Sequence, residues 1–313
     1  GAAGWLAAGP HRATAPAGRP RLVLLAVVGG ERPLLAVVGA GGTARAAAVT
    51  LPPEAVAVVP GYGEATFAEA SRLPGPMLRA AAANVLGLWV DRYAVVAADA
   101  LAAAVDRAGG LPLRLPAELS GSGEPSRVTF SGEQLVGFLA GRGEAADLRW
   151  RVALGALLGR GVLGTADLSE TDDGAAAVRI LRAAGGAEVA PLPTRRLDEG
   201  LLLPDLDAVD GLAARLFGGP GTAPVRVSVW NGSGTPGVGR LVAERLIPAG
   251  FRIVLSENAD AFGQAETVIT AVGREHRAAA ERVRELLGVG RVQVQRVPSG
   301  FSDLGIVVGE DFG

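Results

Sequence analysis

The stretch from Val225 to Ile253 constrains the fold most, because it has the pattern of a strand, a glycine-rich turn, a helix and a second strand. The valines at positions 225, 227 and 229 follow the two-residue period of a half-buried strand. The Asn-Gly-Ser-Gly sequence at 231–234 predicts a sharp turn, because Asn and Gly tolerate left-handed backbone. Thr235 is expected to cap the helix, with Pro236 at its first position.

The composition predicts a folded protein and excludes several classes of function. Of the 313 residues, 49% are hydrophobic and 20% are charged, as in globular proteins. The formal net charge is −2 with no basic stripe, which argues against a nucleic-acid partner. Cysteine is absent, so thiol nucleophiles, cysteine-based zinc sites and disulfides are excluded. The only histidines, His11 and His276, do not support a Ser-His-Asp site.

The order of the expected elements predicts an α/β fold with two domains. Apolar runs at residues 21–28 and 34–38 predict strands covered on both faces, and strands alternate with helices along the rest of the chain. Helices are expected at residues 77–88, 100–108, 144–158, 207–217 and 275–287. The expected organisation is a flexible tail at 1–20, an α/β domain at 21–217, a linker at 218–223 and a small α+β domain at 224–313.

The glycine-rich turn allows two interpretations. Gly232–Gly237 matches the GxGxxG pattern between a strand and a helix, and Glu257 lies near the position of a ribose-binding acid. A nucleotide-binding module is therefore one interpretation. The other is that the glycines only make a tight turn, because too little chain follows Glu257 for a full doubly wound sheet. Both stay open at this point.

The end of the chain resembles a known module. The stretch from Val227 to Ile253, with Glu257–Asp260, Glu266–Ile269 and Gly305–Phe312, is similar to the LytR C-terminal domain. That module stands at the end of many actinobacterial LytR-CpsA-Psr cell-envelope proteins.

The first domain is similar to the catalytic domain of the same family. The resemblance is carried by Leu86–Val96, Val105–Leu113 and Phe130–Phe138, and by residues 49–52 and 60–63. It implies an α-β-α sandwich around a mixed sheet. The family's enzymes move an anionic glycopolymer from a polyprenyl-pyrophosphate carrier onto peptidoglycan, outside the membrane. The resemblance also implies arginines and Mg²⁺-binding carboxylates around the diphosphate, and a long apolar pocket for the lipid.

The sequence departs from the family where these ligands are expected. In the Leu-Pro-Arg-Asp segment the arginine is Pro53 and the aspartate is Glu54, and the Arg-x-Asp-Thr aspartate is missing at residues 31–34. Thr66 and Ala68 replace the Lys-x-Asn pair, and Ala140 replaces the first arginine of Arg-x-Arg. The remaining candidates are Arg142, Arg149 and Arg151 for anion binding and Glu54 for a metal. The other interpretation of the arginines is that they are solvated helix charges.

These departures lead to the hypothesis of a catalytically impaired LytR-CpsA-Psr-like protein without a cofactor. Its expected partners are cell-wall glycopolymer or polyprenyl-phosphate lipid, and peptidoglycan. The alternative is an active glycopolymer–peptidoglycan phosphotransferase using the three arginines, Glu54 and Mg²⁺. Because the chain begins at Gly1 and not at Met, we expect a missing N-terminal membrane anchor and an extracytoplasmic location.

Overall fold

The computed structural model describes residues 18–312 except 43, 144, 198–199, 219–222 and 296–301. Most of the expected tail and linker, and with them Trp5 and His11, lie outside the described residues. In the described part, no helix has both the length and the apolar composition that a bilayer crossing needs.

The larger sheet has six strands in the order β10-β3-β2-β1-β6-β9. It combines an antiparallel hairpin with parallel neighbours: β1 (Arg21–Val28) is antiparallel to β2 (Leu34–Ala40) and parallel to β6 (Arg92–Ala97). The others are β3 (Ala47–Leu51), β9 (Leu168–Thr171) and β10 (Glu188–Pro191). β2 pairs antiparallel with β3, and β6 with β9, while β10 is parallel to β3. The sheet is therefore mixed.

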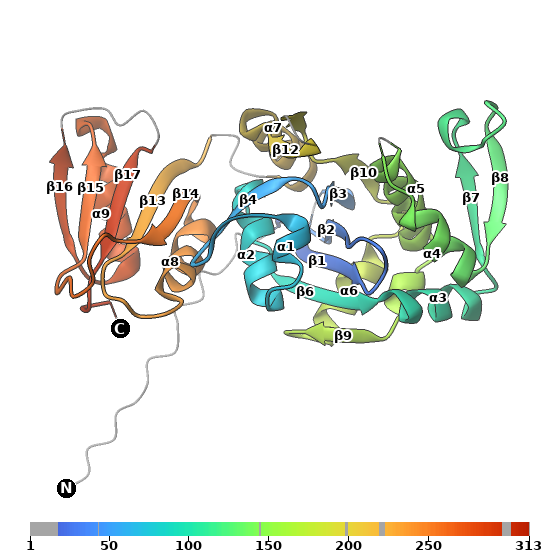
Figure 1. Cartoon of the computed structure of the whole chain (residues 1–313), viewed down its shortest axis with the longest axis horizontal. Coiled ribbons are helices and arrows are strands. Elements are labelled where there is room, and N and C mark those ends of the chain that lie inside the picture. Colours follow the sequence, from blue (N-terminus) through green and yellow to red (C-terminus); the bar gives the residue numbers. More distant parts are fainter. Residues whose placement is uncertain are drawn as a thin grey trace, which may run out of the picture.

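Helices cover both faces of this sheet, as Figure 1 shows. The two faces follow from alternation along β1, where Leu22 and Leu24 enter one core cluster and Val23 and Leu25 the other. The first face is covered by α1 (Phe67–Ala70), α2 (Gly75–Leu86) and α7 (Leu206–Phe217). The second is covered by α3 (Ala98–Arg107), α4 (Gly132–Ala140), α5 (Ala146–Gly159) and α6 (Gly174–Ala183).

Three short hairpins complete the larger unit. They are β4 (Val56–Val59) with β5 (Gly63–Thr66), β7 (Leu111–Leu115) with β8 (Ser126–Phe130), and β11 (Thr194–Arg196) with β12 (Leu202–Pro204). The β7–β8 hairpin stands at the end of the molecule farthest from the C-terminal sheet (Figure 1).

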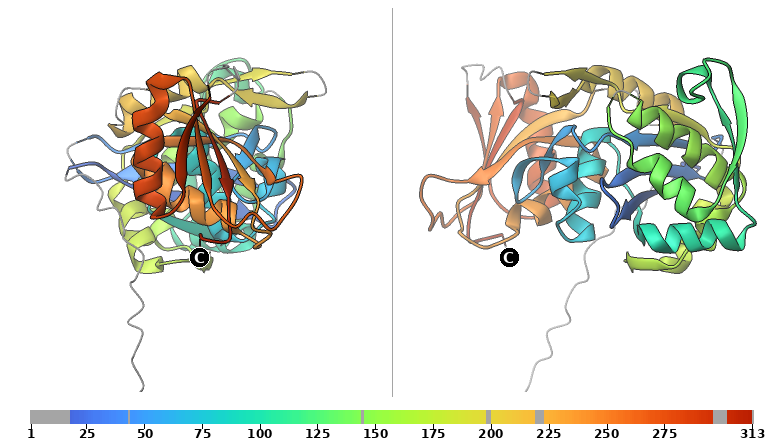
Figure 2. Two further views of the ribbon diagram at one scale, coloured as in Figure 1. Left: turned by 90° about the vertical axis from the view of Figure 1, so that its left-hand side faces the viewer. Right: turned by 45° about the vertical axis from the view of Figure 1, so that its right-hand side comes forward.

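The C-terminal sheet has five strands in the order β14-β13-β17-β15-β16. Its strands are β13 (Val225–Asn231), β14 (Phe251–Asn258), β15 (Val268–Val272), β16 (Arg291–Gln295) and β17 (Leu304–Val308). The helices α8 (Val238–Leu246) and α9 (Arg277–Leu287) pack on it and on each other, as the left view of Figure 2 shows. The expected strand–turn–helix–strand unit is thus present.

The start of α8 corrects the expected helix cap. The helix begins at Val238, with Gly237 in the left-handed conformation as its N-cap, and not after Thr235. The reason is Asn231, whose side-chain oxygen accepts hydrogen bonds from the Gly234 amide and the Ser233 hydroxyl, both at 3.0 Å. Its Nδ2 group donates to the Thr235 carbonyl. These bonds hold residues 232–236 as a loop.

The two sheets share one continuous apolar core, which sequence reasoning did not anticipate. The core cluster on the α2 face includes Leu22 and Phe67 as well as Val227, Ile253 and Phe312. Strand β14 contacts α2, β4 and β5. The C-terminal unit is therefore packed against the larger body and not merely tethered to it.

Buried polar side chains lock this contact. The Asn84 amide forms two hydrogen bonds with the backbone of Ile253, from the Ile253 N–H at 2.8 Å and to its carbonyl at 2.7 Å. The Arg252 guanidinium is 5% exposed and donates to the Asn84 and Val85 carbonyls and to both carboxylate oxygens of Asp210. Both units thus contribute to one satisfied buried network.

Glycine allows the backbones to approach closely beside this network. The Gly61 amide donates to Ser256 Oγ at 2.8 Å, and a Cβ added at Gly239 would lie 2.9 Å from Gly61 Cα. A side chain at position 239 would therefore separate the two units.

The Asp303 carboxylate is expected to make a pH-dependent contribution to the free energy of unfolding. Burial raises the pKa of its carboxyl, but the hydrogen bonds and charge of Arg226 outweigh burial and hold the pKa below its ordinary value of 3.8. A lowered folded-state pKa stabilises the protein above the unfolded pKa, and this contribution is lost as the pH falls through the folded pKa. We expect Asp303→Asn to reduce stability at neutral pH by about 1 kcal/mol or less, with a difference that shrinks below about pH 4. Urea unfolding across this range measures it, and a pH-independent difference would contradict the assignment.

Candidate functional site

The candidate residues lie at one edge of the larger sheet, where β1 and β3 end and β2 begins. The strands β1, β3, β6 and β10 point the same way, so their carboxyl ends meet at this edge. In open α/β sheets, ligands bind beyond these ends. Helix α5 begins beside them, because Trp150 donates its indole N–H to the Leu35 carbonyl at 2.9 Å.

Glu54, the predicted metal ligand, faces an arginine. The Arg32 guanidinium lies 3.3 Å from the Glu54 carboxylate. The Arg32 side chain is 13% exposed and that of Glu54 48%. Arg32 was not predicted as a site residue, because nothing in the sequence pairs positions 32 and 54. The ion pair balances the charge of both side chains.

Arg151 is also paired internally. Its Nε donates at 2.8 Å to Asp147, one helical turn earlier on α5. The second oxygen of Asp147 accepts from the hydroxyl of the fully buried Thr50 at 2.7 Å. Asp147 thus joins β3 to α5, and Arg151 balances its charge.

Arg149 and Arg142 differ from Arg151, because neither forms an ion pair or a hydrogen bond with the described residues. The Arg149 guanidinium lies 5.8 Å from the Phe138 ring centre, and its buried Nη1 has no hydrogen-bond partner. It also lies against Gly141, where a Cβ would collide with it. Arg142 follows Gly141 and is exposed.

The structure therefore brings Arg142 and Arg149 together beside Gly141, whereas Arg151 lies beside Asp147. Positions 149 and 151 lie roughly 200° apart around an α-helix, so Arg149 faces α4 and Gly141 while Arg151 faces Asp147. Because neither Arg142 nor Arg149 has a carboxylate partner among the described residues, both are candidates for binding an anion.

The space between the sheet and helices α3 and α4 is filled. A cavity of about 20 Å³ remains next to the candidate site. Side chains line it almost entirely with apolar atoms; they are Val27, Leu34, Ala98, Leu101, Val136, Leu139 and Ala140, with Gly30 and Glu31. A cavity of this size holds roughly one water molecule, so this cavity is too small for a lipid tail.

Glu54 and Asp147, two carboxylates at this edge, are poorly placed to hold Mg²⁺, because each is paired with an arginine. A protein-held Mg²⁺ is usually bound by one or two carboxylates free to face it, with water and phosphate oxygens. Here Glu54 faces Arg32, and Asp147 faces Thr50 and Arg151. Within the described residues, no three His, Asp or Glu side chains are grouped in the way a metal site needs.

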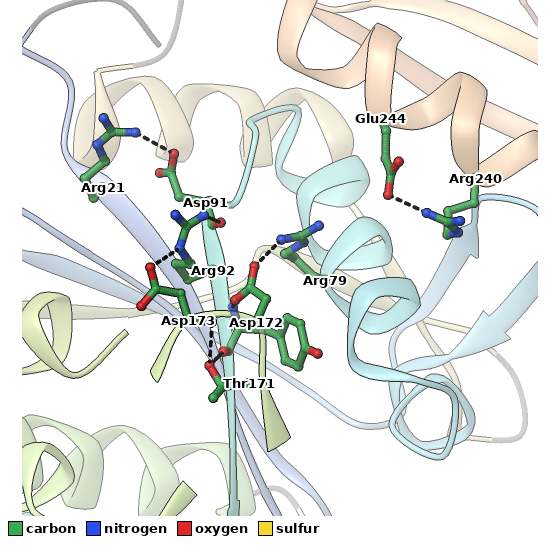
Figure 3. Close-up of polar contacts among 10 residues, drawn as sticks. Arg21, Arg79, Asp91, Arg92, Thr171, Asp172, Asp173, Arg240 and Glu244 are labelled. Atoms are coloured by element: carbon green, nitrogen blue, oxygen red, sulfur yellow. Dashed lines mark hydrogen bonds and ion pairs between the residues drawn. The ribbon is translucent and has the colours of Figure 1, made fainter. Parts of the chain in front are cut away.

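A second charged cluster lies at the opposite edge of the sheet, where β1 and β6 begin (Figure 3). Arg21 pairs with Asp91, Arg92 with Asp173 and Arg79 with Asp172. Burial, with the charge of Glu170, raises the pKa of Tyr93. The cluster contains equal numbers of arginines and carboxylates, namely Arg19, Arg21, Arg79, Arg92, Asp91, Glu170, Asp172 and Asp173. It is therefore balanced, and holds the strand ends together.

The GxGxxG loop uses its amides internally. The Gly232 N–H donates to the Val308 carbonyl, and those of Gly234 and Thr235 donate to the side chains of Asn231 and Ser233. A Cβ at Gly232 would lie 2.9 Å from Val307 Cγ1. Both facts favour the interpretation as a tight turn, because a phosphate-binding loop needs amides free to face the ligand.

Comparison with known protein families identifies the C-terminal unit. The family described as LytR cell envelope-related transcriptional attenuator matches residues 224–312. No curated protein sequence matches the chain significantly.

Solved structures match the larger unit. TagT bound to LI-WTA is 16% identical with a TM-score of 0.53, over 64% of this chain and 91% of that one. YwtF (TagT), a LytR-CPS2A-psr family protein with bound octaprenyl pyrophosphate lipid, is 15% identical with a TM-score of 0.52, over 66% and 94%. TagV of B. subtilis is 14% identical with a TM-score of 0.51, over 63% and 96%.

At these identities the structural matches establish the fold. They confirm the predicted α-β-α sandwich around a mixed sheet, and the family match confirms the predicted C-terminal module. The chain thus combines the fold of the LytR-CpsA-Psr proteins with a LytR C-terminal domain at residues 224–312.

Proposed function

We propose that this chain is a cell-envelope protein that binds a polyprenyl-phosphate-linked glycopolymer without transferring it. The proposal rests on one observation at the carboxyl edge of the sheet: some of the charged side chains there pair with one another, and others do not. Arg142 and Arg149 are without ionic partners among the described residues, whereas Arg32, Glu54, Asp147 and Arg151 neutralise one another. The site therefore offers positive charge for an anion, while the carboxylates of Glu54 and Asp147 are each paired with an arginine.

The chemistry of Arg149 supports phosphate as the anion. A planar guanidinium donates two parallel hydrogen bonds to phosphate oxygens. Its Nη1 donor is buried and unsatisfied, and such a donor gains a full hydrogen bond when a ligand arrives. The solved relatives described as bound to octaprenyl pyrophosphate and to LI-WTA support the choice of a lipid-linked, phosphate-bearing ligand.

The residues at the positions that bind the diphosphate in the family support the proposed absence of transfer. Pro53 and Ala140 carry no charge, and Glu54 is paired with Arg32. Without a clamp on both phosphates, the charge that develops on the leaving group is not stabilised.

A binding experiment with a short-chain prenyl pyrophosphate tests the proposal. We expect wild-type protein to bind this probe and Arg149→Gln to bind it about tenfold more weakly, because a charge-assisted hydrogen bond pair is lost. Arg151→Gln, which removes the same charge from the same helix, is the matched control and should bind within about twofold of wild type. Calorimetric titration measures both.

A turnover assay distinguishes binding without transfer from active phosphotransfer. The protein is incubated with the prenyl pyrophosphate, an acceptor glycan and Mg²⁺, and release of phosphate or prenyl phosphate is followed. We expect no release above the rate without protein. Release that disappears in Arg142→Ala would instead establish the phosphotransferase alternative, and failure of the wild type to bind the probe would refute both.

A further inference from the structure

Strand β16 forms one edge of the C-terminal sheet. It pairs with β15 on one side and, among the described residues, with no strand on the other. Four of its five residues are exposed, and Val292 packs against the core under α9. Figure 1 places β16 at the end of the molecule opposite the β7–β8 hairpin. The larger unit therefore lies away from this edge.

The other edges of the two large sheets are protected against pairing with a further strand. Strand β14 is covered by α2, β4 and β5. Strand β10 ends at Pro191, which has no N–H to donate, and β9 carries Glu170 and pairs irregularly with β6. Covers, prolines, charges and bulges are the usual means of preventing edge-to-edge pairing. Strand β16 has no proline and pairs regularly with β15, and its one charge, on Arg291 at its first position, faces Glu266 at 3.1 Å.

The unpaired backbone groups of β16 belong to its two valines. The Arg291 N–H donates to the Thr267 carbonyl, and the Gln295 carbonyl accepts from the N–H of residue 273, so both ends of the strand face β15. Backbone groups alternate in direction along a strand. The N–H and C=O groups of Val292 and Val294 therefore point away from the sheet.

The sequence of β16, Arg-Val-Gln-Val-Gln, is complementary to its own reverse. When two copies run antiparallel about a two-fold axis at Gln293, Val292 of one copy lies opposite Val294 of the other. Both valines present outward backbone groups, so each such pair exchanges its N–H and C=O hydrogen bonds. Arg291 then lies opposite Gln295, and no like charges meet across the pair.

The side chain on the axis is already held in place. The Gln293 Oε1 atom accepts from Arg291 Nη1 at 3.2 Å, and its Nε2 group donates to Thr270 Oγ1 at 2.9 Å. The amide keeps one hydrogen and one lone pair for a neighbour. Because this row of polar side chains is ordered within one copy, little conformational freedom is lost when a second copy arrives.

We propose that β16 pairs with β16 of a second copy of this chain and joins the two C-terminal sheets into one continuous sheet. Main-chain hydrogen bonds supply the recognition, as in other additions of a strand to an exposed edge. The match of the strand to its own reverse identifies the second copy as the occupant. The pairing is independent of the proposed function, because β16 lies in the other unit.

Only one short strand of each copy takes part, so the interface belongs to the small, weak class. We expect a dimer with a dissociation constant on the order of 0.1 mM. Sedimentation equilibrium of the whole chain from about 0.01 to 1 mM measures it. Amide hydrogen exchange locates it: the outward amides of Val292 and Val294 should gain protection as the concentration rises, while that of Gln293, which faces β15, should change little.

A charge exchange at Gln293 tests the register. Gln293→Lys places two lysines opposite each other on the axis and should weaken the dimer about fivefold. An equimolar mixture of Gln293→Lys and Gln293→Glu places opposite charges there and should dimerise at least as strongly as the wild type. Recovery in the mixture also shows that both variants are folded.

The matched control is Thr129→Lys, which adds the same charge at an exposed position of β8, at the other end of the molecule. It should dimerise within about twofold of the wild type. The inference is wrong if the wild type stays monomeric over the whole range, or if a dimer forms without protection of β16. It is also wrong if the control loses as much affinity as Gln293→Lys, or if the mixture does not recover.

Discussion

Replacing Arg252 by alanine is expected to reduce the free energy of unfolding by about 3–5 kcal/mol, because breaking a buried ion pair leaves its partners unpaired. The Asp210 side chain, which is 17% exposed, would lose its ionic partner, and the carbonyls of Asn84 and Val85 would lose their donor. The loss is large compared with a typical domain stability of roughly 5–15 kcal/mol. Urea unfolding followed by circular dichroism measures it.

The control for this variant lies on the same helix as Asp210. Arg215 pairs with Glu188 at 2.7 Å, but both side chains are more than half exposed. Arg215→Ala is therefore expected to change stability by less than about 1 kcal/mol. If the two variants lose similar amounts of stability, the contact between the two units is not the buried, rigid interface described above.

A second large effect is expected for Trp150. Its side chain is buried at 3% exposure in the core cluster on the α5 face, and truncation of a buried tryptophan to alanine costs about 3–5 kcal/mol. The change also removes the hydrogen bond to the Leu35 carbonyl. We therefore expect Trp150→Ala to lower stability by this amount and to weaken anion binding, because Arg149 is next to it on α5.

Trp150→Phe separates these two consequences. It keeps most of the buried area and loses the indole N–H, so its expected loss is about 1–3 kcal/mol from the unsatisfied carbonyl and reduced packing. Prenyl pyrophosphate binding should stay close to that of the wild type at a temperature at which the variant is folded. Strong binding by the alanine variant when it is fully folded would show that Trp150 does not position the site.

Sequence patterns correctly predicted the helices and strands whose conformation is determined by residues close to them in the sequence. The continuous apolar runs of β1 and β2 are confirmed as strands, and the helices expected at residues 100–108 and 207–217 are confirmed as α3 and α7. The strands β8 and β9 were missed, because both are short and largely polar or exposed. Their pairing, and not their sequence, makes them strands.

The candidate site was only partly predictable for a similar reason. The arginines and Glu54 were chosen from a resemblance, but the side chains that neutralise them come from distant positions. Arg32 reaches Glu54 across 22 residues of sequence, and Thr50 reaches Asp147 across 97. Whether a charge faces a ligand or a partner side chain depends on such tertiary contacts, which the spacing of residues within one element does not encode.

The buried seam of Asn84, Asp210 and Arg252 has a consequence for how such proteins diversify. Recombination that joined a foreign C-terminal module at the linker would need to deliver an arginine at the second position of the incoming edge strand and a backbone in register with Asn84. A module without the arginine would leave the Asp210 carboxylate buried without an ionic partner. A module out of register would leave the Asn84 amide buried without its hydrogen-bond partners. The two halves of this chain are therefore expected to be inherited as a unit.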